Sequence, residues 1–227
     1  MKRRLGLIAA GLLTLAAPLY ANEPVPDTGG ACVPISERAG RTFGCFIIAA
    51  QPVGKLDGAS FWHLETFSDR AAAEKAKSAH GVVAEAFDKT WLLTIAAAGW
   101  HSAGGTHVAE IGPLPTTAGR EYTAQFMEAT FRPGMKSRVH RHSGPEAWYT
   151  ISGETCLETP EGSMVNRPGG PPVIVPQGPP MELTATGTET RKSLVLILHD
   201  SSQPHTMLAT DWAPKGLCTV GANKPDK

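Results

Sequence analysis

The chain has 227 residues, of which 41% are apolar, and it carries 21 basic and 21 acidic side chains. This length and apolar content suit one large or two small globular domains with a core that folds unaided. Without residues 1–21, which carry three basic and no acidic side chains, the balance is 18 basic to 21 acidic. This mildly acidic charge argues against a nucleic-acid partner, because phosphate binding needs clustered Lys and Arg. The nearest approach to such a cluster is Lys136, Arg138 and Arg141.

Residues 1–21 have the pattern of a secretory signal peptide. Basic residues 2–4 precede an apolar run from Leu5 to Ala17, and Ala21 supplies the small residue of a cleavage site. This run of thirteen residues falls short of the ~20 that cross a bilayer as a helix, so no integral membrane segment is expected after processing. The expected location is periplasmic or secreted, by either the general or the twin-arginine export route.

Four cysteines in an exported chain predict two disulfides, for which the sequence alone allows three pairings. We expect Cys32 to pair with Cys45, which closes a short loop worth roughly 3 kcal/mol on the chain-entropy model. Cys156 would then pair with Cys218 and tie the C-terminal part of the chain to the strands before it. The alternative is that Cys156 is a metal ligand or a redox thiol.

Residues 22–42 have the composition of a linker that contains Cys32. A small α+β module is predicted over residues 43–115, with Pro113 and Pro115 marking its end. Its expected strands are 43–50, 59–67, 82–87 and 90–97, and its expected helix is 70–79, capped by Ser68. A lid, a dimerisation surface and a partner-docking surface all remain open as roles for this module.

This N-terminal half contains His63, His80, His101 and His107, and none of them stands in a pair with the spacing of chelating ligands. Isolated histidines lack the convergent geometry that metal ligands need. We therefore expect them to be surface or hydrogen-bonded core residues.

Residues 116–220 read as an all-β barrel or sandwich, because short apolar strands alternate with Pro and Gly turn signals. The expected strands include 122–131, 173–175 and 193–198, and residues 158–172 are expected to connect two hairpins. Residues 221–227 read as a tail.

The stretch around residue 140 holds the metal-competent side chains. His140 and His142 are two residues apart, so on a strand both imidazoles leave the same face, roughly 6.6 Å apart. Glu146 begins the next apolar run, after a predicted turn, and would return a carboxylate beside them. Two imidazoles and one carboxylate form a facial triad that holds a divalent metal with open positions. The spacing of Gly134, His140, His142, Glu146 and Gly153 resembles the first motif of the cupin superfamily.

The spacing of Gly170, Pro176 and Gly178 is similar to that of the second cupin motif. The family usually places a third histidine ligand where this chain has Met181, and often an asparagine where it has Ala185. The resemblance implies a double-stranded β-helix, a cupin jelly-roll barrel, after the α+β module, and a metal site within the barrel. Cupins include enzymes as well as storage and sensing proteins, so the fold leaves the function open.

The expected metal ligands are His140, His142, Glu146 and Met181, with Glu146 also the candidate catalytic residue. A ligating Met181 thioether favours copper, whereas Met181 as a wall residue leaves Mn, Fe, Zn or Ni. Arg138, Trp148 and His199 are the expected lining of a substrate pocket.

Three interpretations follow. The first is a metalloenzyme of oxygenase or isomerase type acting on a small molecule. The second is a non-catalytic cupin that binds a small ligand or a metal such as copper, and the third is a protein-interaction scaffold. Association into a homo-oligomer is an open expectation, because edge strands can pair.

Overall fold

The computed structural model describes residues 32–221, so the predicted signal peptide and all but the first residue of the predicted tail lie outside the described part. The described chain is mostly β, with an architecture consistent with a β-barrel jelly roll. Its strands form sheets of six, four, three and two strands. Within these residues, no helix is long and apolar enough to span a membrane.

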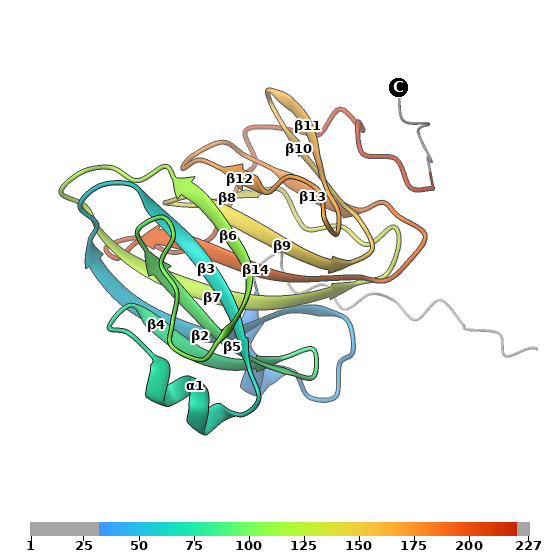
Figure 1. Ribbon diagram of the computed structural model, residues 1–227. Coiled ribbons are helices and arrows are strands. Elements are labelled where there is room, and N and C mark those ends of the chain that lie inside the picture. Colours follow the sequence, from blue (N-terminus) through green and yellow to red (C-terminus); the bar gives the residue numbers. More distant parts are fainter. Residues whose placement is uncertain (1–31, 222–227) are drawn as a thin grey trace, which may run out of the picture.

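The six-stranded sheet runs through the middle of the molecule (Figure 1). Its strands, in spatial order, are β1 (Val33–Pro34), β2 (Gly44–Lys55), β7 (Glu121–Phe131), β14 (Arg191–Asp200), β9 (Glu146–Ser152) and β12 (Val173–Val175). The opposite wall of the barrel combines a sheet of β11 (Gly162–Asn166), β10 (Thr155–Thr159) and β13 (Glu182–Ala185) with the pair β15 (Met207–Leu208) and β8 (His140–Arg141). A core cluster that includes Met127, Trp148, Leu157, Leu183 and Val195 fills the space between the two walls.

The four-stranded sheet covers the other face of the six-stranded sheet. Its order is β4 (Gly81–Ala86), β5 (Lys89–Ala96), β3 (Ser60–Phe67) and β6 (Thr106–Leu114), and helix α1 (Arg70–Ala76) lies on its far side (Figure 1). Trp62 and Leu64 of β3 share one buried cluster with Phe126 of β7 and Leu196 of β14. The two sheets therefore have a common core.

The α+β module expected over residues 43–115 is not seen as a unit of its own. β2 does not join the sheet of β3–β6 but pairs with β7 along its whole length, inside the six-stranded sheet. The rest of the segment packs on that same sheet through the shared core. Local sequence patterns predict where strands form but not which strands pair. The sequence of residues 43–115 therefore suggests an independent module, although its strands pack on the rest of the chain.

Burial on both faces explains the continuous apolar run in β14. Leu194, Leu196 and Leu198 face the four-stranded sheet, whereas Val195 and Ile197 face the barrel interior. A strand buried on both faces has no polar side to alternate with its apolar one.

One strand boundary and two whole strands show where the structure differs from the sequence-based expectation. β2 continues through Pro52 to Lys55, and Pro52 is tolerated there because the strand carries an irregularity between Pro52 and Gly54. β6 was not expected, because Pro113 interrupts its pattern, but it is an edge strand in which a missing donor costs little. β11 lies inside the segment that was expected to be a connection, and it pairs with β10 as a hairpin.

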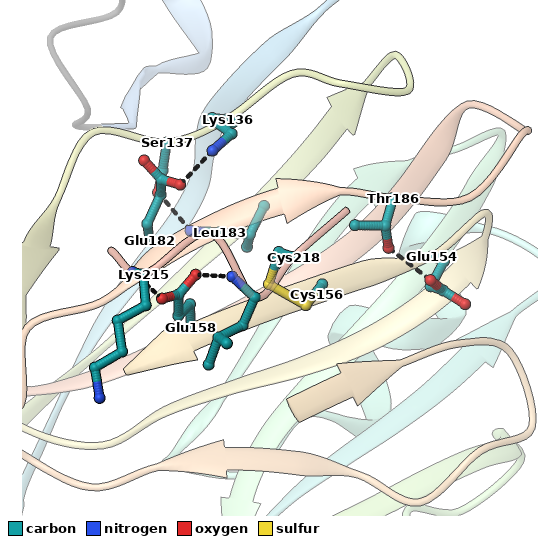
Figure 2. The surroundings of a disulfide bond; sticks show 11 residues. Lys136, Ser137, Glu154, Cys156, Glu158, Glu182, Leu183, Thr186, Lys215 and Cys218 are labelled. Carbon is teal, nitrogen blue, oxygen red and sulfur yellow. Dashed lines mark hydrogen bonds and ion pairs between the residues drawn. A yellow bond between two sulfur atoms is a disulfide. The ribbon is translucent and has the colours of Figure 1, made fainter. Parts of the chain in front are cut away.

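Both predicted disulfides are confirmed, Cys32 with Cys45 and Cys156 with Cys218. Figure 2 shows how the second one holds the C-terminal segment against β10. Next to it, the buried carboxylate of Glu158 accepts hydrogen bonds from the backbone N–H groups of Lys215 and Leu217. The C-terminal segment therefore lies fixed on the outside of the barrel wall, and Cys156 is no free thiol or metal ligand.

Candidate metal centre

His140, His142 and Glu146 come together inside one end of the barrel. His140 lies on β8, His142 directly follows that strand and Glu146 begins β9, and one ligand atom from each lies within 4.8 Å of the other two. All three are buried, with 7%, 2% and 6% of their surface exposed. The turn between these strands needs Gly144, because a Cβ there would lie 1.9 Å from the carbonyl oxygen of Leu198. Only glycine lets β14 approach this turn so closely.

Backbone carbonyls fix the orientation of both imidazoles. His140 Nδ1 donates to the carbonyl of Arg138 at 2.7 Å, and His142 Nδ1 donates to the carbonyl of His205 at 2.6 Å. Because a carbonyl only accepts, each ring carries its proton on Nδ1 and presents the lone pair of Nε2. This tautomer is the one that a metal ligand needs.

Two buried atoms of the group are left without a hydrogen bond. His142 Nε2 and Glu146 Oε2 lie 3.1 Å apart, yet neither has a hydrogen-bond partner of proper geometry within the described residues. Two ligands about 2.1 Å from one ion at right angles would be about 3 Å apart. Two nitrogens and one oxygen also suit a divalent transition metal. The residues present therefore fit a metal ion.

Met181 lies directly beside His140. The two residues exchange both backbone hydrogen bonds, His140 N to Met181 O at 3.0 Å and Met181 N to His140 O at 2.8 Å. Residues paired in this way project their side chains from the same face. Met181 is buried in the barrel cluster, so its thioether belongs to the wall next to the first histidine.

The electrostatics of the group differ from one histidine to the other. Burial lowers the pKa of His140, and the neighbouring His142 lowers it further. Burial also acts to lower the pKa of His142, but the Glu146 carboxylate outweighs it and raises that pKa. Burial lowers the pKa of the nearby His205 to about 4. The carboxylate therefore acts chiefly on the histidine that it touches.

The three residues expected to line a substrate pocket have different positions. Trp148 is buried on the inner face, two residues after Glu146 on β9, and its Nε1 lacks a hydrogen-bond partner among the described residues. His199 is half-buried near the end of β14, with its ring 6.0 Å from that of His205. The Arg138 side chain is exposed, and its backbone carbonyl is what reaches the site.

Arg191 is a residue that the sequence analysis missed. Its side chain is fully buried above the ring of Phe131, at 5.2 Å from the ring centroid. Nε and Nη2 have no hydrogen-bond partner within residues 32–221. Burial lowers its pKa to about 10, against the opposing effect of the Glu146 charge. No sequence signal identifies it, because Arg191 follows polar residues and reads as the exposed start of a strand.

No protein-family model and no curated protein matches this chain. Solved structures do match part of it. A DMSP lyase from Ruegeria pomeroyi DSS-3 is 20% identical over 41% of this chain and 45% of its own, with a TM-score of 0.34. A cupin superfamily protein from Desulfitobacterium hafniense DCB-2 is 17% identical over 38% of this chain and 74% of its own, with a TM-score of 0.31.

An oxalate oxidase is 18% identical over 38% of this chain and 46% of its own, with a TM-score of 0.33. The matches thus span less than half of the lyase and oxidase chains. The Desulfitobacterium hafniense structure carries the name of the cupin superfamily, which the two motifs of this chain resemble.

Proposed function

We propose that this protein is an exported metalloenzyme in which His140, His142 and Glu146 hold a divalent metal that acts on a small molecule. The observation that carries the proposal is the pair of orphaned atoms, His142 Nε2 and Glu146 Oε2, buried 3.1 Å apart. Leaving such atoms unpaired costs free energy unless a further partner joins them. A metal ion satisfies both at once.

A divalent ion bound there would supply Lewis acidity toward an oxygen of the small molecule. The chain provides the setting. Trp148 and Met181 form buried apolar walls that exclude water. The carbonyls of Arg138 and His205 hold the imidazoles in the ligating tautomer.

The small molecule that we propose carries a negative charge. A buried guanidinium without a carboxylate partner is costly, and a bound anion would offset that cost. Among the described residues Arg191 is such a group, and the Glu146 charge acts on it through the barrel interior.

The testing experiment is elemental analysis of the mature protein, beside the double variant His140→Ala, His142→Ala. The expected result is the loss of one equivalent of metal per chain in the double variant. His80→Ala, which removes a histidine outside this group, is the matched control and should retain the metal. Equal metal content in the double variant and the wild type would refute the ligand assignment.

Enzyme activity needs a separate test with the metal-loaded protein. Glu146→Gln keeps the shape of the side chain but removes its charge, so turnover should fall by at least about 100-fold. The metal-loaded protein should be tested with a panel of hydroxy and keto acids. If it binds these anions but forms no product from any of them, the enzyme proposal is refuted and the ligand-binding interpretation takes its place.

Copper handling is a second candidate, favoured by the position of Met181 beside His140. A thioether is a soft ligand that prefers Cu(I) to harder ions. In this proposal the same triad would bind the metal as cargo.

Export remains part of the proposal. The two disulfides favour an oxidising compartment, in agreement with a periplasmic or secreted location. Fractionation of cells that express the full chain, with the N-terminus of the mature protein sequenced, tests it. A protein found in the cytoplasm with residues 1–21 still attached would refute export.

A further inference from the structure

A second group of metal-competent side chains lies outside the barrel interior, on the four-stranded sheet of β3–β6, which we call the outer sheet. Glu65 of β3 and His107 of β6 are directly opposite each other in the antiparallel pairing of these strands. His101 lies in the segment that connects β5 to β6. One ligand atom from each of the three lies within 4.8 Å of the other two.

Glu65 is the unusual member of this group. It is 1% exposed, and both carboxylate oxygens accept from the backbone N–H of Ser102, at 3.1 and 3.2 Å. Within the described residues no lysine or arginine forms an ion pair with it, and its nearest basic atom is His101 Nδ1 at 3.7 Å. A buried carboxylate without a permanent cation carries a desolvation cost that a bound cation would offset.

The two imidazoles are open to solvent on the other side. The His101 side chain is 55% exposed, His107 is also exposed, and their rings stand edge to face with centroids 4.9 Å apart. An ion could therefore reach the group without any opening of the fold. Two imidazoles with one carboxylate select Zn, Cu or Ni rather than Mg or Ca, which prefer all-oxygen sites.

We propose that Glu65, His101 and His107 form a second divalent transition-metal site, with solvent completing the coordination. Glu65 and His107 are fixed in the sheet, while His101 belongs to a connecting segment. A metal ion here would tie that segment to β3 and β6. The site shares no residue and no strand with the barrel triad.

The test measures Zn(II) binding by equilibrium dialysis in the His140→Ala, His142→Ala background, which isolates the second site. One Zn(II) per chain is expected there. Adding His101→Ala and His107→Ala should lower the Zn(II) affinity by more than about 100-fold. Loss of a residue that only hydrogen-bonds to a metal ligand lowers the affinity by less than this. Adding His80→Ala instead is the matched control and should leave one Zn(II) bound.

The carboxylate has its own test. Glu65→Gln retains an oxygen that can accept from Ser102 but removes the charge, so the Zn(II) affinity should fall while the metal-free circular dichroism spectrum stays unchanged. Zn(II) binding that survives either Glu65→Gln or the two additional histidine substitutions at full affinity would overturn the proposal. If the barrel variant does not fold, the wild-type background serves, in which His101→Ala with His107→Ala must remove one of the Zn(II) ions bound.

Discussion

The structure gathers two histidines and a glutamate in two places, and the surroundings of the two groups differ. In the barrel, His140, His142 and Glu146 are all buried. On the outer sheet, only Glu65 is buried, and both histidines face solvent. The same set of residue types, two histidines and one glutamate, can thus form an enclosed site, suited to chemistry away from water, or an open site that exchanges its ion with solvent.

The largest effect is expected from a substitution in the turn that encloses His140, His142 and Glu146, which we call the barrel group, as Glu65, His101 and His107 are called the outer group. Gly144→Ala would push a Cβ to 1.9 Å from the Leu198 carbonyl oxygen, so β14 or the turn before Glu146 must move. We expect a loss of more than about 4 kcal/mol of unfolding free energy and loss of the barrel metal. Chemical denaturation and metal analysis measure the two effects.

The matched variant is Gly104→Ala in the segment of the outer group. Its Cβ would meet nothing within 4 Å, and only its positive φ of 81° opposes the change. A loss of about 1–2 kcal/mol is expected. Similar losses for the two variants would show that the barrel turn is no more tightly enclosed than the outer segment.

The next effect concerns the disulfides that frame the barrel. Replacing Cys156 and Cys218 by Ala opens a link between residues 62 apart, worth about 4 kcal/mol on the chain-entropy model. The same change at Cys32 and Cys45, which are 13 apart, should cost about 3 kcal/mol. Neither change touches the outer group, so its Zn(II) affinity should persist below the melting temperature. A larger loss at the shorter link would contradict the entropic account.

Arg191 sharpens the comparison from within the barrel. Because its guanidinium is buried and has no carboxylate partner in the described part of the chain, Arg191→Met should raise the unfolding free energy of the ligand-free protein by about 1–2 kcal/mol. The same variant should bind small anions more weakly than the wild type. Arg141→Met, which removes an arginine paired with Asp211 near the surface, should change stability by about 1 kcal/mol or less. A marked loss of stability in Arg191→Met would mean that the guanidinium is already well satisfied.

Met181 gives the barrel group a possible thioether ligand that the outer group lacks, so the two groups should differ in their preference for Cu(I). Met181→Leu preserves volume but removes the sulfur, so Cu(I) affinity at the barrel group should fall about 10-fold while Zn(II) affinity is retained. Competition with a Cu(I) chelator measures this. Unchanged Cu(I) affinity would assign Met181 to the wall of the pocket, and the outer group, which has no thioether among its three members, provides the reference.

The smallest effect is a pH dependence at the barrel end. The Ser202 hydroxyl and N–H lower the pKa of Asp200, at the start of the segment that carries His205. A carboxyl with a depressed pKa contributes stability above its unfolded value of about 4 and loses it as the pH falls. Asp200→Asn should therefore be less stable than the wild type at pH 7, and the difference should shrink on acidification. Melting temperatures from pH 7 to pH 3 measure it, and a constant difference would contradict this origin.

The two groups were not equally predictable. In the barrel, His140, His142 and Glu146 lie within seven residues of one another, so one turn returns Glu146 to the two histidines, although β8 and β9 pair with different strands. Glu65, His101 and His107 belong to two strands and a connecting segment, so their convergence depends on which strands pair. Pro113 interrupts the strand pattern of β6, so the sequence does not predict that His107 lies opposite Glu65. The histidines of that half therefore have no partners that sequence spacing alone could indicate.

Local periodicity, residue spacing and cysteine count were enough to predict a β-rich barrel, two disulfides and the grouping of His140, His142 and Glu146, whereas the structure selected one disulfide pairing from the three that the sequence allows. Tertiary structure decided that β2 joins the barrel sheet, that β3–β6 cover it, and that Arg191 Nε and Nη2 are buried without a hydrogen-bond partner among residues 32–221. These features depend on contacts between residues distant in the chain. Local patterns set the shape of a strand and the side chains on each face, but the neighbour it finds is selected by packing over the whole core.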